Sequence, residues 1–229
     1  MVNHIALIMD GNRRWAKKRA FVPWRGHREG VEAVRRVVEY SANRNIKHLS
    51  LYAFSLENFK RSKEEVGYLF DLVLEFAKET LQEFIKEKIR VRFVGDRSLF
   101  PKHVLPALEE LEEQTKNFDR LSVHFLFCYG GRQELIAAGR CLADKVQRGE
   151  LAPEHVTEDT FVSCLWTHGI PDADLIIRTG GQHRLSNFLP YQSTYSELYF
   201  TDMFWPDIQA RDLDAVLEWY EQVKRNFGK

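Results

Sequence analysis

The sequence contains few cysteines and no long apolar run. Its 229 residues include three cysteines, Cys128, Cys141 and Cys164, and none belongs to a Cys-x-x-Cys pair. An odd number of separated cysteines argues against a disulfide framework, so a reducing cytoplasm is the expected location. No stretch of about 18 apolar residues is present to span a bilayer, and the N-terminus lacks the features of a signal peptide. These absences predict a soluble protein without stable membrane insertion.

The sequence also lacks an excess of charge of either sign. Lys and Arg total 33 and Asp and Glu total 33, so no overall field attracts the chain to nucleic acid or to an acidic membrane. A nucleic-acid face would need a broad basic stripe on a positively charged domain, and nucleic acid is therefore not expected as a partner. Any anionic ligand must be held by local groups of cations. A hydrophobic content of 44% over this length fits a single domain, residues 1–229.

Short apolar runs alternate with longer amphipathic segments along the chain. This alternation predicts an α/β fold with a mostly parallel central sheet of about six strands and helices on both faces. Strands are expected at residues 5–9, 49–54, 91–94, 122–128, 175–177 and 198–200. Helices are expected at residues 28–43, 64–87, 102–117, 133–147, 158–167 and 210–226. The helix at 64–87 carries an apolar stripe, for which two interpretations stay open: packing against the sheet, or lining of an apolar pocket.

Polar residues directly follow three of the expected strands, at 10–15, 55–61 and 178–187. Ligands of open α/β sheets bind at the carboxyl ends of the strands, so these segments are the candidates for a site. In the first segment, Gly11 permits close backbone approach, and the helix expected to start there would turn its positive end toward an anion. Asp10 supplies a hard oxygen for Mg²⁺ bridging to a diphosphate, with Arg14 and His27 within expected reach. An ordinary helix cap at Asp10 beside a solvated or nucleic-acid-binding basic face remains an equal alternative on this segment alone.

The third segment favours the anion-binding interpretation. Arg178 and Arg184 flank a Gly-Gly turn, and His183 and Ser186 lie nearby in the sequence. Such a segment supplies bidentate donors and a flexible backbone at one strand end, which predicts a second anion site. Two anion sites with a carboxylate between them suggest a reaction between two phosphorylated substrates.

A series of motifs runs from residue 4 to the C-terminus. In order, they are residues 4–16 (HIALIMDGNRRWA), Gly26-His27, residues 52–59 (YAFSLENF) with Arg61, residues 129–132 (YGGR), residues 178–188 (RTGGQHRLSNF), residues 197–200 (ELYF) and Trp205-Pro206. This ordered set resembles the motifs of the cis-prenyltransferase (undecaprenyl diphosphate synthase) family and covers nearly the whole chain.

The resemblance implies Mg²⁺ as cofactor, allylic and homoallylic C5 diphosphates as substrates, and a homodimer. It assigns catalysis to Asp10, Ser55 and Asn58, and metal binding to Asp10, His183 and Glu197, with Glu197 near a subunit boundary. It assigns substrate binding to Gly11, Asn12, Arg13, Arg14, Trp15, His27, Phe59, Arg61, Arg178, Arg184 and Ser186. Within that set, Gly11, Asn12, Arg14 and His27 would hold the allylic diphosphate. Arg178, Arg184 and Ser186 would hold the second one.

Several positions depart from the family pattern. Pro23 stands where the family commonly has an arginine that binds the allylic diphosphate, and Gln182 replaces a glutamate. Residues 226–228 (Asn-Phe-Gly) replace a frequent Arg-x-Gly motif, and Arg225 is the one candidate to substitute for its arginine.

The expected tunnel for the hydrocarbon chain is lined by bulky residues. Long-chain members keep this tunnel open with small side chains, whereas the wall here is expected to comprise Ala53, Leu69, Val73, Phe76, Leu126 and Phe127. Phenylalanines leave no spare room in a close-packed wall, so we expect a short product of about two to four isoprene units. The alternative is that these aromatic side chains belong to the ordinary core.

Two other functions remain open. One is irregular coupling of two dimethylallyl diphosphates, of lavandulyl or cyclolavandulyl type. The other is a non-catalytic accessory subunit, which the retention of Asp10, Arg178, Arg184 and Ser186 argues against.

Overall fold

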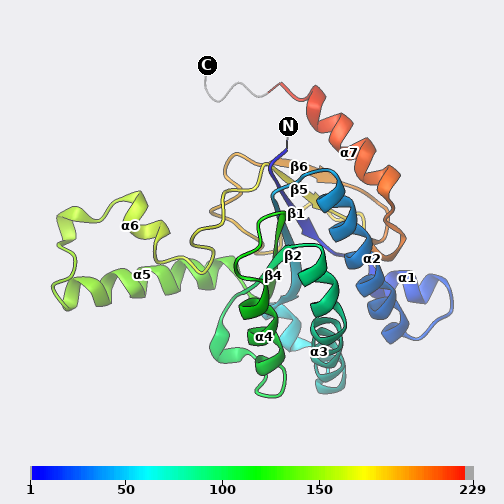
Figure 1. Ribbon diagram of the computed structural model, residues 1–229, viewed down its shortest axis with the longest axis horizontal. Helices are drawn as coiled ribbons and strands as arrows, with labels where there is room; N and C mark the ends of the chain where they lie inside the picture. Colours follow the sequence, from blue (N-terminus) through cyan, green and yellow to red (C-terminus); the bar gives the residue numbers. More distant parts are fainter. Residues whose placement is uncertain (1, 225–229) are drawn as a thin grey trace.

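The computed structural model describes residues 2–224 and is built around a six-stranded sheet. All neighbouring strands run parallel, in the order β3-β4-β2-β1-β5-β6 (Figure 1). The strands are β1 (His4–Ile8), β2 (His48–Ser55), β3 (Ile89–Val94), β4 (Leu121–Tyr129), β5 (Leu175–Arg178) and β6 (Glu197–Phe200). The prediction of an α/β fold with about six parallel strands is confirmed.

Seven α-helices lie within residues 2–224. They are α1 (Asn12–Lys18), α2 (Pro23–Asn43), α3 (Lys63–Lys86), α4 (Leu105–Thr115), α5 (Gly131–Gln147), α6 (Glu158–Val162) and α7 (Ala210–Gln222). Helix α2 begins at Pro23, earlier than expected, because proline is well accommodated at the first helical position. Helix α6 is shorter than expected, since the chain turns after Val162 and buries Leu165 and Thr167. Helix α7 ends at Gln222, earlier than expected, because the backbone is already extended at Val223. Residues 225–226 of the expected helix and the departures at residues 225–228 lie outside the described residues.

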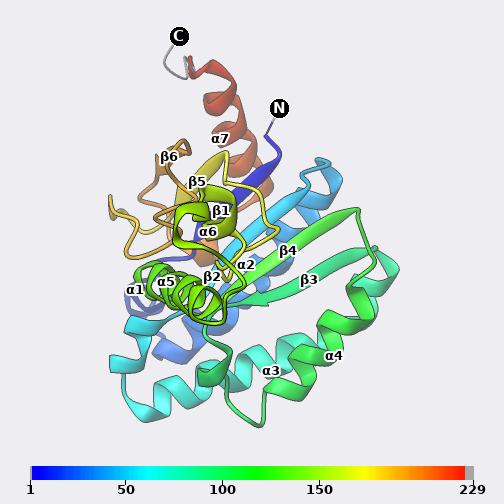
Figure 2. The same ribbon diagram turned by 90° about the vertical axis from the view of Figure 1, so that its left-hand side faces the viewer.

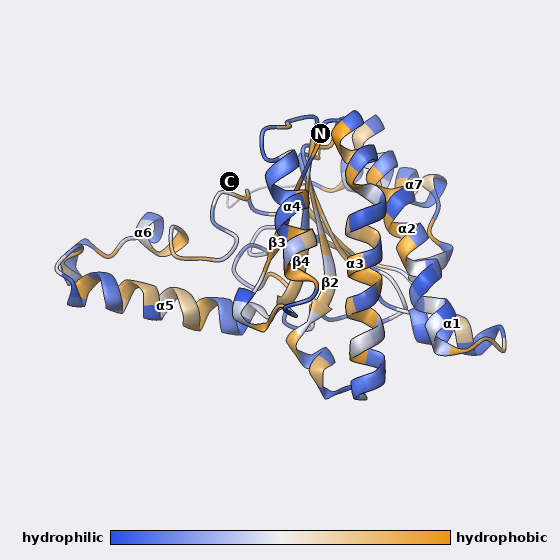
Figure 3. Ribbon diagram, turned by 60° about the horizontal axis from the view of Figure 1, so that its bottom comes forward, coloured by the Kyte–Doolittle hydropathy of each residue, from blue (hydrophilic) through white to orange (hydrophobic). Residues whose placement is uncertain are grey.

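The larger hydrophobic core lies on the face of the sheet that α2, α3, α4 and α7 cover. Side chains alternate between the two faces of a strand, and Leu7, Leu51 and Phe125 of three adjacent strands all point into this core. Helix α3 adds Phe70 and Phe84 from its apolar stripe, and Figure 3 shows apolar and polar residues recurring along this helix. Packing against the sheet is therefore one role of the stripe. In the part of the chain that the structure describes, no helix has the length and hydropathy needed to cross a bilayer.

The second face of the sheet is packed mainly by loop residues of the segment 163–190. Trp166, Ile170 and Phe188 contribute to a smaller apolar cluster with Ala6 and Ile8 of β1. Figures 1 and 3 show α5 leaving the body of the molecule, and Figure 2 shows α6 alongside it, so that the two helices form a projecting arm. Helix α5 therefore extends away from the face on which a covering helix was expected.

A disulfide joins Cys141 of α5 to Cys164, which corrects the expectation drawn from the cysteine count. The two residues are 23 positions apart, and the return of the chain along α5 brings their Cα atoms to 5.9 Å. The spacing of the cysteines in the sequence does not predict this pairing, because the two residues meet only through the tertiary arrangement of α5 and the segment after α6. Cys128 keeps a free thiol, and burial raises its pKa to about 12.

Candidate active site

The first and third polar segments meet at the carboxyl ends of the neighbouring strands β1 and β5. The backbone N–H of Asp10 donates to Thr179 Oγ1 (3.1 Å), and the Thr179 hydroxyl donates to the Asp10 carbonyl (2.7 Å). Gly180 has a φ of +85°, and a Cβ there would lie 2.6 Å from Nη2 of Arg14. Glycine is therefore needed at position 180 for the two segments to approach this closely.

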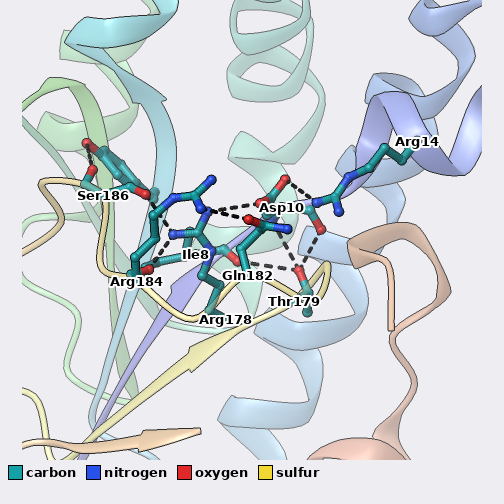
Figure 4. Close-up of polar contacts among 9 residues, drawn as sticks. Ile8, Asp10, Arg14, Arg178, Thr179, Gln182, Arg184 and Ser186 are labelled. Atoms are coloured by element: carbon teal, nitrogen blue, oxygen red, sulfur yellow. Dashed lines mark hydrogen bonds and ion pairs between the residues drawn. The ribbon is translucent and has the colours of Figure 1, made fainter. Parts of the chain in front are cut away.

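Asp10 lies between two arginines, as Figure 4 shows. One carboxylate oxygen is 3.1 Å from Arg14 Nη2, and the other is 3.0 Å from Arg178 Nη2. Its side chain is 31% exposed, whereas that of Arg178 is only 5% exposed. The N-cap of α1 is Gly11, which has a φ of +114°, so the alternative in which Asp10 is an ordinary helix cap is wrong.

The structure brings together the residues expected to form the second anion site. Arg178 Nη1 donates to Ser186 Oγ (2.7 Å) and to the carbonyl of Arg184. The Nε atom of Arg178 is buried without a hydrogen-bond partner among the described residues. The exposed Arg184 side chain donates a hydrogen bond to Gln182 Oε1 (2.7 Å). Gln182 replaces the glutamate of the family pattern. Its neutral amide leaves the charge of Arg184 in place, whereas a glutamate would neutralise it. Arg14, Arg178 and Arg184 therefore carry more positive charge than the single carboxylate of Asp10 neutralises.

A buried carboxylate that the sequence did not single out, Glu65 of α3, faces the first anion site. Arg61 Nη1 donates to its Oε1 (2.9 Å), and the exposed Arg13 approaches its Oε2 at 3.8 Å. His27 Nε2 lies 3.4 Å from Oε1 but makes no hydrogen bond there. Burial, and then the charge of Arg61, lowers the pKa of His27 to about 4, so its ring is neutral at pH 7. Arg61 is four residues before Glu65 but precedes the first residue of α3, so no helical spacing marks Glu65 in the sequence.

Two cavities adjoin in this region. The larger, about 720 Å³, is polar and lies along α1 and the start of α2; residues lining it include Asp10, Gly11, Asn12, Arg13, Arg14, Lys17 and Pro23. The smaller, about 160 Å³, is mainly apolar and lies between α2, α3 and the sheet. Met9, Asn12, His27 and Arg61 line both cavities. The Oδ1 atom of Asn12 is buried without a partner among the described residues, so a hydrogen-bond acceptor is free where the cavities meet.

The apolar cavity is lined by four of the six expected wall residues, Ala53, Leu69, Val73 and Phe76. Part of the α3 stripe therefore lines the cavity, as the second interpretation of that stripe proposed. The expectation for Leu126 and Phe127 is wrong, because Leu126 points to the opposite face of the sheet and Phe127 packs against Phe54, Phe70 and Phe100. Their place is taken by Phe93 and Phe125, whose rings stack 5.3 Å apart.

Ser55 and Asn58 form a local cap at the end of β2. The side chain of Ser55 accepts a hydrogen bond from the Asn58 backbone, and Asn58 Oδ1 accepts one from the Ser55 backbone (3.1 Å). This reciprocal pair starts the short helix η1 (Leu56–Lys60) and fixes Asn58 where its side chain lines the apolar cavity. Both residues are therefore held at the junction between the sheet and the site.

Four other expected site residues are placed differently. Trp15 is buried and donates its indole N–H to Asp207 (2.6 Å), and Phe59 packs on Phe54, with ring centroids 5.0 Å apart; neither lines either cavity. His183 is exposed and stacks on Phe200. Glu197 begins β6 beside the first residue of β5, at the end of the strand remote from Asp10. Within residues 2–224 of a single chain, no group of three or more metal-ligating side chains is assembled, so the expected set of Asp10, His183 and Glu197 is not gathered.

A parallel sheet whose carboxyl edge carries clustered arginines above an apolar cavity is typical of α/β enzymes that bind ligands at the strand ends. Residues 8–228 match the family model described as putative undecaprenyl diphosphate synthase. The chain belongs to this cis-prenyltransferase family and is a prenyltransferase.

Curated relatives are similar over almost the full chain. An isoprenyl transferase of Streptococcus thermophilus is 44% identical over 230 residues, covering 99% of this chain and 92% of the relative. An isoprenyl transferase of Thermotoga maritima is 44% identical, with 98% and 96% covered. A ditrans,polycis-undecaprenyl-diphosphate synthase of Micrococcus luteus, specific for (2E,6E)-farnesyl diphosphate, is 40% identical, with 98% and 90% covered.

Two solved structures share the fold over the whole chain. Lavandulyl diphosphate synthase from Lavandula x intermedia, in complex with dimethylallyl diphosphate, has a TM-score of 0.96 at 34% identity, covering 100% of this chain and 98% of the other. A probable undecaprenyl diphosphate synthase from Campylobacter jejuni has a TM-score of 0.82 at 33% identity, covering 100% and 99%. Isoprenoid diphosphates are thus named for the Micrococcus luteus and Lavandula x intermedia proteins.

Proposed function

We propose that this prenyltransferase is Mg²⁺-dependent and condenses an allylic diphosphate with a second C5 isoprenoid diphosphate to give a short product. One observation carries the proposal: the polar, arginine-lined cavity adjoins a small apolar cavity, and Met9, Asn12, His27 and Arg61 line both. A diphosphate in the first cavity would direct its hydrocarbon into the second.

The residues present fit a Mg²⁺ ion that is shared with a diphosphate. Asp10 offers a partly exposed carboxylate beside the polar cavity, and Mg²⁺ usually takes one or two carboxylates together with substrate phosphates. When bound, the ion would neutralise negative charge on the leaving diphosphate. Asp10 is the residue that would hold it.

Different arginines bind the diphosphate groups of the two substrates. Arg14, with the neighbouring backbone, lies where it can stabilise charge on the leaving allylic diphosphate. Arg178, Arg184 and Ser186 hold the second diphosphate nearby, which orients its double bond toward the allylic carbon. Proton loss from the coupled product would go to a diphosphate oxygen assisted by Ser55 or Asn58.

Product analysis with purified protein tests the proposal. Dimethylallyl diphosphate, isopentenyl diphosphate and Mg²⁺ are supplied together and separately, and the products are identified by mass spectrometry. We expect a short prenyl diphosphate that requires both substrates and is lost in Asp10→Ala. Long polyprenyl products would contradict the short chain, and equal rates for Asp10→Ala would contradict the role of Asp10.

Irregular coupling of two dimethylallyl diphosphates is the second candidate, and one comparison favours it. The lavandulyl diphosphate synthase superposes with a TM-score of 0.96 and the Campylobacter jejuni protein with 0.82, although their identities to this chain are nearly equal at 34% and 33%. Product from dimethylallyl diphosphate alone would select this candidate over regular elongation.

A homodimer is part of the proposal. Ile136 of the arm is 56% exposed and Leu198 of β6 is 39% exposed, so apolar side chains are available for association. Sedimentation of the purified protein at the mass of a monomer only would contradict it.

A further inference from the structure

The disulfide between Cys141 and Cys164 lies in the arm, defined here as residues 131–167. Cys141 is in the middle of α5, and Cys164 is in the segment that follows α6 and leads back toward the sheet (Figure 1). Both cysteines are partly exposed, so a small reductant can reach the bond. The bond therefore ties the return segment of the arm, residues 158–167, to α5.

The return segment contacts the loop that carries the second anion site, here the anion loop, residues 179–192. The Tyr191 hydroxyl donates to Glu158 Oε1 (2.8 Å), and the Tyr191 ring lies 5.5 Å from that of Phe161. Cys164 is three residues beyond Phe161, so the disulfide restrains the element against which Tyr191 packs.

A second contact between the arm and the anion loop is buried. Glu134 of α5 is 0% exposed and accepts four hydrogen bonds: from the Thr167 backbone (2.9 Å), the Thr167 hydroxyl (2.7 Å), the Tyr129 hydroxyl (2.5 Å) and Gln192 Nε2 (3.0 Å). All four donors are neutral, so no cation compensates the buried carboxylate. The four hydrogen bonds together offset the free-energy cost of removing it from water, and each of them is needed. Thr167 is three residues beyond Cys164, and a shift of the return segment would remove two of the four donors.

The start of α5 fixes the anion loop at a third point. The Gly131 N–H donates to the Asn187 carbonyl (2.8 Å), and the Arg132 N–H donates to Asn187 Oδ1 (2.8 Å). Asn187 follows Ser186, whose hydroxyl accepts from Arg178 (2.7 Å). The stretch from Ser186 to Gln192 is therefore held at both ends by residues of the arm.

We propose that the Cys141–Cys164 disulfide positions the second-diphosphate site through Glu134, Tyr191 and Gln192. This inference rests on the proposed function. In the oxidised protein the bond fixes the return segment, and the anion loop is preordered for the second substrate. A dithiol reduces the bond by passing two electrons and two protons to it, which leaves two cysteine thiols and the dithiol as its own disulfide. The return segment is then restrained only by non-covalent contacts, and the affinity for the second diphosphate falls.

Steady-state kinetics of the oxidised protein, the dithiol-reduced protein and the double variant Cys141→Ser/Cys164→Ser test this inference. The KM for the second diphosphate substrate is expected to rise at least about fivefold in the reduced and double-variant proteins, at the lower end of usual couplings between sites. The KM for the allylic substrate and kcat are expected to stay within about twofold, since Asp10 and Arg14 lie outside the arm and the loop. An unchanged KM for the second substrate in the double variant would overturn the inference.

Two further variants locate the effect. Cys128→Ala removes the one other thiol and is expected to respond to the dithiol as the unmodified protein does. Glu134→Gln keeps the side-chain size but alters the buried network, and is expected to raise the same KM in the oxidised protein; an unchanged KM would exclude the route through Glu134. Titration with inorganic diphosphate gives a readout independent of turnover, and weaker binding is expected after reduction. Absence of prenyl transfer by the oxidised protein would end the proposed function, whereas transfer that is indifferent to reduction would end only this inference.

Discussion

At the scale of single residues, Arg178 is the buried cation of the site, and its charge requires a carboxylate partner. Its side chain is 5% exposed, and Asp10, at 3.0 Å, is its carboxylate partner. Removing one partner of a buried ion pair leaves an uncompensated charge. Asp10 is therefore needed for the integrity of the site as well as for chemistry.

Asp10→Asn is expected to lower turnover by roughly 10²–10³, because it removes the carboxylate proposed to hold the Mg²⁺ ion that would neutralise the leaving diphosphate. It is also expected to lower the free energy of unfolding by about 1–2 kcal/mol, less than for a fully buried pair because the Asp10 carboxylate is partly exposed to water. Turnover and urea unfolding measure the two effects. Asp71→Asn, which removes a carboxylate that is 71% exposed, is the control and should change neither; retained turnover in Asp10→Asn would contradict the assignment.

The residues that sequence reasoning missed have definite physical reasons. Glu65 is one of two consecutive acids in the first turn of α3, where acids are common because they complement the helix dipole, so nothing in the sequence marked it as a site residue. Its buried position between Arg61 and His27 is a tertiary property. Asp10 and Arg178 were predictable, because each lies at the carboxyl end of a strand that forms the site, and Ser186 was predictable as part of the polar segment that follows β5.

At the scale of elements, α3, β3 and β4 together close the apolar cavity. Phe76 contacts the ring of Phe125 at 5.4 Å, and Phe125 stacks on Phe93 at 5.3 Å. The cavity measures about 160 Å³, well below the roughly 300–1,000 Å³ of pockets for drug-sized ligands. These three rings are therefore the structural basis for the short product that we propose.

Phe76→Ala is expected to lengthen the product by at least one isoprene unit, because it removes one wall of the cavity, and to cost about 3–5 kcal/mol of stability. Mass spectrometry of the products and thermal unfolding are the measurements. Phe84→Ala is the matched control, since Phe84 is buried on the same helix but does not line the cavity. Phe84→Ala should lose a similar amount of stability with no change in product length. A product of unchanged length from Phe76→Ala would contradict the role of this ring in setting chain length.

The elements themselves were largely predictable, and the errors have local causes. All six strands appear within two residues of their expected bounds, since buried parallel strands are continuous apolar runs. The error at Leu126 arises from the period of two along a strand: neighbouring residues face opposite sides, and Phe125 rather than Leu126 faces the helices. The projection of α5 and the disulfide in the arm depend on contacts between distant segments, for which local sequence gives no signal.

At the scale of the whole molecule, buried histidines make stability depend on pH. Burial lowers the pKa of His4, on the second face of the sheet, and of His27, beside the active site, to about 4. Both are neutral in the folded protein at pH 7, whereas the unfolded chain takes up protons near pH 6.5. The contribution of these two neutral histidines to stability is therefore fully present above pH 6.5 and is lost as the pH falls toward 4.

At pH 5, each of these histidines is expected to reduce the free energy of unfolding by about 1–2 kcal/mol relative to pH 7.5. Urea unfolding at the two pH values measures the loss. In His4→Asn the loss should be smaller than in the unmodified protein, and His155→Gln, which alters an exposed histidine, should leave it unchanged. A loss as large in His4→Asn as in the unmodified protein would contradict the contribution of His4.

The central claim is that one chain holds two diphosphate groups side by side above the ends of β1 and β5. Calorimetric titration with isopentenyl diphosphate and an unreactive thio-analogue of dimethylallyl diphosphate, in the presence of Mg²⁺, tests it most directly. We predict two bound diphosphates per chain, and loss of the isopentenyl diphosphate site alone in Arg184→Ala. Saturation at one diphosphate per chain, or unaltered binding of both ligands in Arg184→Ala, would contradict the account.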